Sequence, residues 1–65
     1  MKNNKDQIKQ LKEMIKIREN EIVIINRKLK EPHGYEAEER LQTDLKKNKE
    51  AIARYEAEIN RLETK

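Results

Sequence analysis

Few side chains in this sequence are of the types that usually carry out covalent chemistry. The 65-residue chain has no serine and no cysteine, so Thr43 and Thr64 are its only aliphatic hydroxyl groups. A hydroxyl nucleophile needs a neighbouring base, and His33 is the only histidine. A chain of this length also builds too small a core to enclose a substrate cavity. The sequence therefore predicts a protein that is not an enzyme and that has no cofactor and no small-molecule substrate.

His33 lies among acidic residues, so a metal site has to be considered. Glu31, Glu36 and Glu38 are its near neighbours in the sequence. One histidine and flexible carboxylates do not supply the fixed set of three or four ligands that a protein metal site needs. We therefore expect His33 to be a turn residue and expect no metal, and we expect Tyr35 to pack over the same turn.

A row of lysines could bind phosphate groups. Residues 1–32 carry a net charge of +4, whereas residues 33–65 carry −1. Regularly spaced ammonium groups on one helix face could follow a nucleic-acid backbone. The alternative is a solvated helix edge, because acidic residues are interspersed and no exposed aromatic cluster is available to stack bases. The candidate nucleic-acid contacts are Lys2, Lys5, Lys9, Lys12 and Lys16.

The single glycine and the single proline divide the chain into two helices. Both lie in the segment Glu31-Pro32-His33-Gly34 near the middle of the sequence. Proline cannot continue a helix, and glycine tolerates the left-handed conformation that a turn often needs. We expect one helix at about residues 4–30, a turn at 31–34 and a second helix at about residues 35–63, all within a single domain.

Both helices carry a seven-residue repeat of apolar side chains, which is typical of a coiled-coil seam. Two such seams joined by a short turn predict an all-α antiparallel helical hairpin. Charge pairing favours a register in which facing residues have numbers that add up to about 70, with Arg18 opposite Ile52 and Ile22 opposite Asn48. The seam positions of the first helix are Ile8, Leu11, Ile15, Arg18, Ile22, Ile25 and Leu29, and those of the second are Leu41, Leu45, Asn48, Ile52, Tyr55, Ile59 and Leu62.

The first helix has more apolar side chains than one partner helix can cover. Met14, Ile17 and Ile24 extend the apolar arc on one side of the seam, and Val23 adds a residue on the other. On the second helix, the small side chains of Ala37 and Ala51 would permit another hairpin to approach. Because the chain has no cysteine to form a disulfide, self-association is a natural source of stability. The hairpin is therefore expected to form a homodimer, a four-helix bundle.

Two polar residues interrupt the seams. Arg18 and Asn48 occupy positions where a coiled coil usually has an apolar side chain. One interpretation is that they specify register and oligomeric state, or that Arg18 reaches a carboxylate such as Glu21 across the dimer. The other is that Arg18 lays its aliphatic stem on the core and extends its guanidinium to water.

These patterns favour a small protein-binding regulator, a dimeric coiled-coil hairpin that modulates a larger protein of unknown identity, such as a transcription factor. The longest apolar run, residues 22–25, is far too short to span a membrane, so we expect a soluble, cytoplasmic protein. The abundance of lysine, asparagine and isoleucine is typical of A/T-rich phage or plasmid genomes. The expected oligomer or partner interface comprises Met14, Ile17, Arg18, Glu21, Val23, Ile24 and Ala51.

Two alternatives use the same hairpin differently. In its two-helix architecture, the chain resembles the plasmid-encoded Rop-type RNA-binding hairpins, which also dimerise into four helices, and the lysine row would be the nucleic-acid contact. That resemblance is one of shape alone, and it implies binding of RNA or DNA. The second alternative is a structural coiled-coil spacer within a larger assembly.

Overall fold

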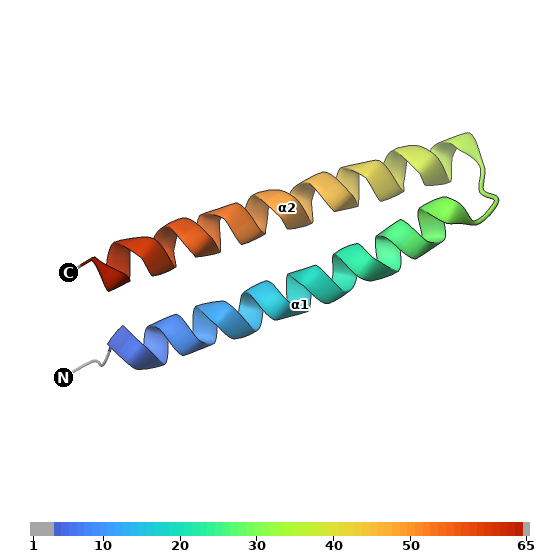
Figure 1. Ribbon diagram of the computed structural model, residues 1–65. Helices are drawn as coiled ribbons and strands as arrows, with labels where there is room; N and C mark the ends of the chain where they lie inside the picture. Colours follow the sequence, from blue (N-terminus) through green and yellow to red (C-terminus); the bar gives the residue numbers. More distant parts are fainter. Residues whose placement is uncertain (1–3, 65) are drawn as a thin grey trace.

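The computed structural model of the chain describes residues 4–64, which form two helices joined by a short turn. Helix α1 spans Asn4–Lys30 and helix α2 spans Tyr35–Glu63. The two helices run antiparallel and lie side by side along their whole length, as Figure 1 shows. The prediction of a helical hairpin is confirmed.

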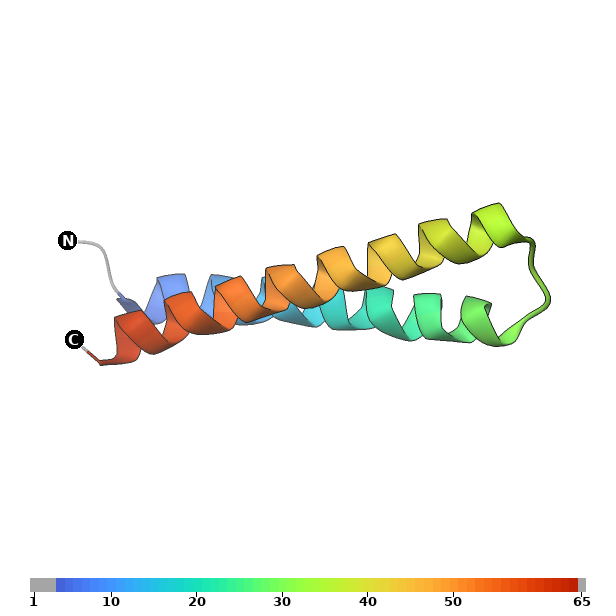
Figure 2. The same ribbon diagram turned by 90° about the horizontal axis from the view of Figure 1, so that it is seen from above.

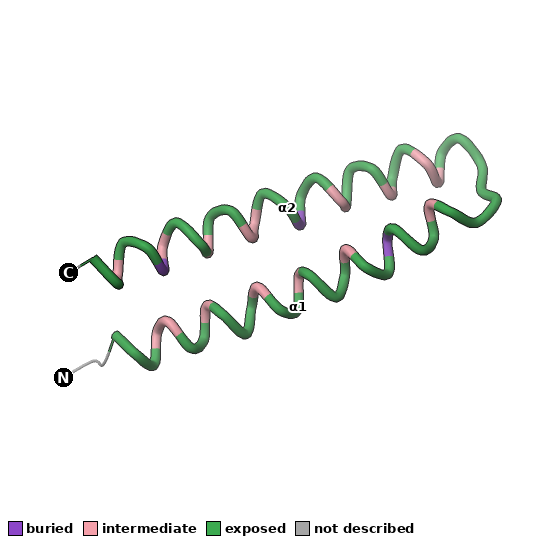
Figure 3. The backbone as a smooth tube through the Cα atoms, in the orientation of Figure 1, coloured by how far each residue is buried: buried purple, intermediate pink, exposed green. Residues whose placement is uncertain are grey.

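One seam between α1 and α2 holds the hairpin together. All of the seam positions that the heptad repeat predicts are buried or half-buried, and Figure 3 shows them along the facing sides of the two helices. Among residues 4–64, Ile25 and Ile59 are the only apolar residues that are buried, and the other apolar seam residues are half-buried. A heptad repeat keeps one stripe of each helix facing its partner, which explains this continuous but narrow core.

The ends of both helices at the turn carry charges that complement the helix dipoles. Arg27, Lys28 and Lys30 lie in the last turn of α1, and Glu36 and Glu38 lie in the first turn of α2. Basic groups stabilise the negative end of a helix dipole, and acidic groups stabilise the positive end. The turn is therefore specified by charge on both sides as well as by Pro32.

Gly34 does not use the left-handed conformation that glycine tolerates. Gly34 is the N-cap residue of α2, with φ −81° and ψ 173°, in the extended region that any residue adopts. It is extended because an N-cap precedes the first helical residue, and this position needs no positive φ. The carbonyl oxygen of Gly34 accepts the first backbone hydrogen bond of α2, from the N–H of Glu38 at 2.9 Å.

The hairpin is a thin rod, with principal extents of 51 × 14 × 14 Å. Figure 2 shows that the two helices cross at a shallow angle instead of lying strictly parallel. No helix in the part of the chain that the structure describes is long and apolar enough to cross a membrane. A rod of two helices leaves most of each helix surface open, so its flanks decide what it can contact.

Candidate functional site

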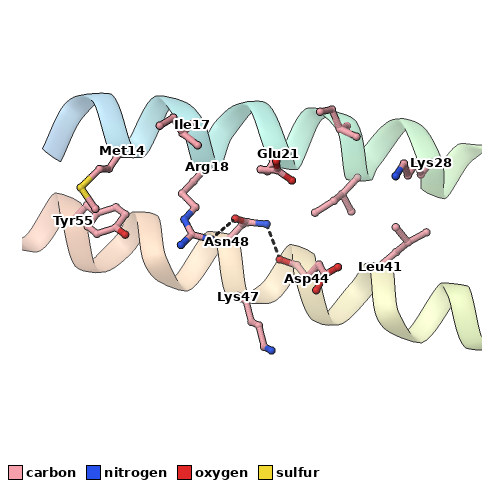
Figure 4. A pocket seen from close by; sticks show the side chains of 12 residues that line it. Met14, Ile17, Arg18, Glu21, Lys28, Leu41, Asp44, Lys47, Asn48 and Tyr55 are labelled. Carbon is pink, nitrogen blue, oxygen red and sulfur yellow. Dashed lines mark hydrogen bonds between the residues drawn. The ribbon is translucent and has the colours of Figure 1, made fainter. Parts of the chain in front are cut away.

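An open groove of about 500 Å³ runs along one flank of the hairpin, between α1 and α2. We call it the apolar groove because most of the α1 side chains in it are hydrocarbon or thioether groups. Figure 4 shows most of its side chains lying between the two helices, with Lys47 pointing away from α1. Its lining residues are Met14, Ile17, Arg18, Glu21, Ile24, Ile25, Lys28, Leu41, Asp44, Lys47, Asn48 and Tyr55.

Three large apolar side chains of α1 remain exposed at this groove. Met14 is 41% exposed, Ile17 is 61% exposed and Ile24 is 44% exposed. Their spacing of three and seven residues places them on one helix face, beside the seam that faces α2. Exposed apolar side chains that gather on one face are typical of surfaces that pack against another protein.

A short chain of hydrogen bonds crosses the middle of the groove. The guanidinium of Arg18 donates to Asn48 Oδ1 at 3.0 Å, and Asn48 Nδ2 donates to the backbone oxygen of Asp44 at 2.9 Å. Asn48 is only 6% exposed, so both hydrogen bonds matter for its stability in the core. Figure 4 draws both as dashed lines beneath the apolar side chains of α1.

The sequence did not predict that Arg18 and Asn48 would bind each other. In the predicted register Arg18 faces Ile52, and the interpretations were a role in register and oligomeric state, a carboxylate across a dimer, or exposure to water. The long arginine side chain instead reaches about one helical turn along α2 to Asn48. A signal was present, because both seam interruptions lie near the same level of the hairpin and each has hydrogen-bonding capacity to satisfy.

Charged groups of both signs border the groove. Glu21 and Lys28 extend from α1, and Asp44 and Lys47 extend from α2. With these side chains and Arg18, the groove has no strong charge of one sign. Such a mixed border suits a protein surface of mixed charge better than a polyanion.

Two residues of the predicted interface lie outside the groove. Val23 is 54% exposed and does not line it, and Ala51 is half-buried on α2 and does not line it either. Val23 is separated because its heptad position lies on the opposite flank of α1. The structure thus brings together Met14, Ile17, Arg18, Glu21 and Ile24 from the predicted set.

The lysine row occupies that opposite flank of α1. Lys5, Lys9, Lys12 and Lys16 line a second, shallow groove together with Ile8, and we call these four residues the lysine face. Glu13 and Glu63 line the same groove and reduce its positive charge. Lys2 lies outside the described residues.

His33 binds an acidic group, as a charged turn residue would. Its Nε2 forms an ion pair with Glu38 Oε1, and its Nδ1 lies 2.6 Å from the backbone oxygen of Glu31. The hydrogen bond to Glu38 is the main reason why the pKa of His33 is raised from its ordinary value of 6.5, and the backbone oxygen of Glu31 adds to it. The pKa of Glu38 is correspondingly lowered, by His33 first and then by Gln42, whose Nε2 donates to Glu38 at 2.9 Å.

The structure assigns no metal site around this histidine. Within residues 4–64, no group of three or more histidine, cysteine, aspartate or glutamate side chains is placed to hold a metal ion. Tyr35, next to the turn, does not pack over it as predicted, since its side chain is 78% exposed.

Comparison of the chain with models of protein families, with curated proteins and with solved structures gives no match. Conclusions about its function therefore rest on the two flanks of the hairpin.

Proposed function

We propose that this chain is a non-enzymatic regulator that acts as a dimeric hairpin and binds a larger protein by packing helix against helix. The observation that carries the proposal is the exposure of Met14, Ile17 and Ile24 along the apolar groove. Residues at this spacing are the anchors with which an amphipathic helix binds a groove or joins a bundle.

The energy available at this surface fits a binding role. Complete burial of an isoleucine or methionine side chain contributes about 1.5 to 3 kcal/mol. Because Met14, Ile17 and Ile24 are already partly covered, contact with another helix would add roughly 1 kcal/mol for each of them. The grooves of the described residues are shallow and open, which suits contact with a macromolecule better than enclosure of a small substrate.

A photoreactive residue placed in the chain tests this proposal. Benzoylphenylalanine would replace Ile17 in the apolar groove or Val23 on the opposite flank, with the exposed Ala57 on α2 as a background control. We expect irradiation of cells to link a larger protein to at least one of the first two positions. That protein, once identified and purified, should form a complex of fixed stoichiometry with the unaltered hairpin. Products that contain only copies of the hairpin at both positions would contradict a larger partner.

A nucleic-acid interface is the second candidate, because the structure gathers the lysine face into one groove. Its four ammonium groups could contact successive phosphates of RNA or DNA. Replacement of Lys9 and Lys16 by glutamate should then abolish binding to an RNA hairpin or a DNA duplex in fluorescence anisotropy. Replacement of Lys46 and Lys47 on α2 provides a charge-matched control. Four phosphate contacts predict a loss of affinity of roughly 150-fold between 50 and 200 mM salt. An affinity that does not change over this range would exclude this function.

A further inference from the structure

The hairpin exposes more surface than a compact protein of its mass. Its accessible surface is 5592 Å² for a mass of 7.9 kDa. A compact monomer of that mass exposes about 4,400 Å². The excess is located on the flanks, since the seam residues are already covered. The two-helix rod therefore has surface that further packing can cover.

Helix α1 has two contact faces, and their angle matches a square bundle. The first face is the seam with α2. The second consists of Met14, Ile17, Glu21 and Ile24, which repeat at intervals of three and four residues. At 3.6 residues per turn, the centres of these two faces are about 110° apart. A helix at the corner of a four-helix bundle needs two neighbours at close to a right angle, so this geometry fits one partner in addition to α2.

On the flank of α2 that borders the same groove, two neighbouring rows of side chains differ in charge. One row has alanine and acidic residues, Ala37, Asp44, Ala51 and Glu58, at intervals of seven. The adjacent row is entirely basic, with Arg40, Lys47, Arg54 and Arg61. In an antiparallel helix pair, one row faces the other row, which brings acidic residues against basic ones. In a parallel pair each row would face itself, and like charges would repel.

We propose that the apolar groove is closed by a second copy of this chain, with α1 packed antiparallel on α1 and α2 packed antiparallel on α2. This inference rests on the proposed helix-packing function and assigns the apolar groove to the dimer contact, so that a larger protein would bind the opposite flank, which includes the exposed Val23. The two-fold axis crosses α1 near residue 19, midway between Met14 and Ile24. Met14 of each copy then faces Ile24 of the other, and both apolar stripes are covered.

The α1 pair and the α2 pair place the two-fold axis at nearly the same level of the rod. Figure 4 places Tyr55 at the level of Met14 and Leu41 at the level of Lys28, so residue 19 of α1 lies near residue 51 of α2. Ala51 is the small side chain of the acidic row at that level, where the two α2 helices approach each other most closely. When the acidic row of one α2 packs against the basic row of the other, the midpoint of that contact lies within about half a helical turn of residue 51.

The second copy also supplies a counter-ion for Arg18. In the antiparallel arrangement Glu21 of one chain lies opposite Ile17 of the other, one residue from Arg18. The guanidinium has five donor hydrogens and uses NH1 for Asn48, which leaves donors for a carboxylate. A carboxylate at this place would accept a charge-assisted hydrogen bond from the remaining donors of Arg18.

The surface available is large enough for a stable dimer. A compact protein of twice the mass exposes about 7,300 Å², whereas two separate hairpins expose about 11,200 Å². The difference of roughly 3,900 Å² is an upper bound for an elongated rod, and stable homodimers bury about 2,000 to 5,000 Å². A dimer of this topology can therefore form without any change in the hairpin.

Spin labels test the orientation of the two copies. The chain has no native cysteine, so Asn20→Cys and Arg27→Cys each accept a single label on the outer side of α1. The proposed axis separates the two labels by about 3 Å along the rod for residue 20 and by about 24 Å for residue 27. Pulsed dipolar spectroscopy should give a longer distance for Arg27→Cys than for Asn20→Cys. Equal distances would show a parallel dimer and overturn the proposal.

Cysteine pairs test which helices are neighbours. The double variant Met14→Cys with Ile24→Cys should form a covalent dimer on mild oxidation. The control, Met14→Cys with Val23→Cys, places the second thiol on the opposite flank and should form it at least about tenfold more slowly. Equal rates in the two variants would place α1 diagonally from its copy and overturn the proposed contact. Circular dichroism would verify that both variants are helical.

Sedimentation equilibrium of the unaltered chain provides a test that does not depend on any variant. The expected mass is about 15.8 kDa, twice the mass of the chain, at micromolar concentrations. A monomer at 100 µM would overturn this inference and the dimeric state in the proposed function, yet the proposed binding of a larger protein would stand if Ile17 became linked to a different protein. A dimer that is linked to no larger protein would contradict the proposed regulator and leave this inference intact.

Discussion

The polar contact between Arg18 and Asn48 shows how single residues adjust a repeating core. Leucine or isoleucine at either position would continue the seam, and coiled coils use such interruptions to fix register at some cost in stability. Both polar atoms of the Asn48 amide are hydrogen-bonded. The oxygen accepts from Arg18 of α1, and the nitrogen donates to the backbone oxygen of Asp44 within α2. The interaction therefore links the two helices at one defined level of the rod.

Removal of the Asn48 amide should destabilise the hairpin. The variant Asn48→Ala loses two hydrogen bonds and leaves Arg18 without its acceptor in a half-buried position. We expect the free energy of unfolding in urea to fall by about 1 to 3 kcal/mol. Asn60→Ala is the matched control, because Asn60 is exposed on the same helix and should change stability by less than about 0.5 kcal/mol. Equal effects in the two variants would contradict a structural role for the buried amide.

The ion pair at the turn should respond to pH. A proton NMR titration should give His33 a pKa above 6.5, because the imidazolium form donates to Glu38 and to the backbone oxygen of Glu31. Glu38→Gln should bring this pKa back towards 6.5, whereas Glu36→Gln, which removes a carboxylate that does not bind His33, should change it far less. A pKa of His33 that is the same in the native chain and in Glu38→Gln would contradict the contact.

The direction of the stability change follows from the two pKa shifts. The pKa of His33 is raised by folding, so its contribution is fully present below pH 6.5 and is lost as the pH rises through the raised value. The pKa of Glu38 is lowered by folding, so its contribution is present above pH 4.5 and is lost as the pH falls through the lowered value. The ion pair of His33 and Glu38 therefore stabilises the turn most between pH 4.5 and pH 6.5.

At the scale of the elements, the turn has a cap that can be improved. Gly34 is the N-cap of α2, yet no side chain caps the free N–H groups of that helix. A Cβ atom added at Gly34 would meet no atom within 4 Å, so a larger residue fits without strain. Gly34→Ser should therefore raise stability by about 0.5 to 1 kcal/mol, through a hydroxyl acceptor and a less flexible unfolded chain.

Thermal unfolding measures this effect and separates its two causes. An increase of about 2 to 6 °C in Tm is expected for Gly34→Ser. Gly34→Ala stiffens the chain equally but has no oxygen to accept a hydrogen bond, so its Tm should be lower than that of the serine variant. A Tm for Gly34→Ser at or below that of Gly34→Ala would show that capping does not limit the stability of α2.

Much of this fold is encoded in short-range patterns. Pro32 and the surrounding charges predict helices at about 4–30 and 35–63, and the structure has them at Asn4–Lys30 and Tyr35–Glu63. The heptad repeat predicts the seam for a similar reason, since a helix face is fixed by spacing alone. The pattern does not determine where a long side chain ends, which is why the Arg18 to Asn48 bond was missed. The pattern also leaves the conformation of Gly34 open, because composition does not distinguish an N-cap from a left-handed turn.

The candidate site was predicted only in part, for a related reason. Spacing identified Met14, Ile17 and Ile24 as surplus apolar residues of α1. The contribution of α2 to the same groove, Asp44 and Lys47 beside Asn48, depends on how the two helices are aligned and rotated about each other. That alignment results from the packing of many side chains, and it cannot be derived from the residue pattern of each helix separately.

At the scale of the whole molecule, folding and association should be one process. Each hairpin buries only a narrow core, so the proposed second copy would contribute much of the stability of the folded state. The two unfolded chains separate when such a dimer melts, and mass action then makes Tm depend on the protein concentration. A hundredfold increase in concentration should raise the Tm of the unaltered chain by about 10 °C.

A charge in the apolar groove should remove this dependence. Ile17→Lys would place an ammonium group in the proposed contact between the two copies of α1, which should raise the dissociation constant of the dimer by at least about 100-fold. Val23→Lys is the matched control, since Val23 is similarly exposed but lies on the opposite flank of α1. Calorimetry over a hundredfold range of concentration should show a lower, constant Tm for Ile17→Lys and a rising Tm for Val23→Lys. If the Tm of the unaltered chain is also constant, each hairpin folds alone, and its apolar groove is then available for a different protein.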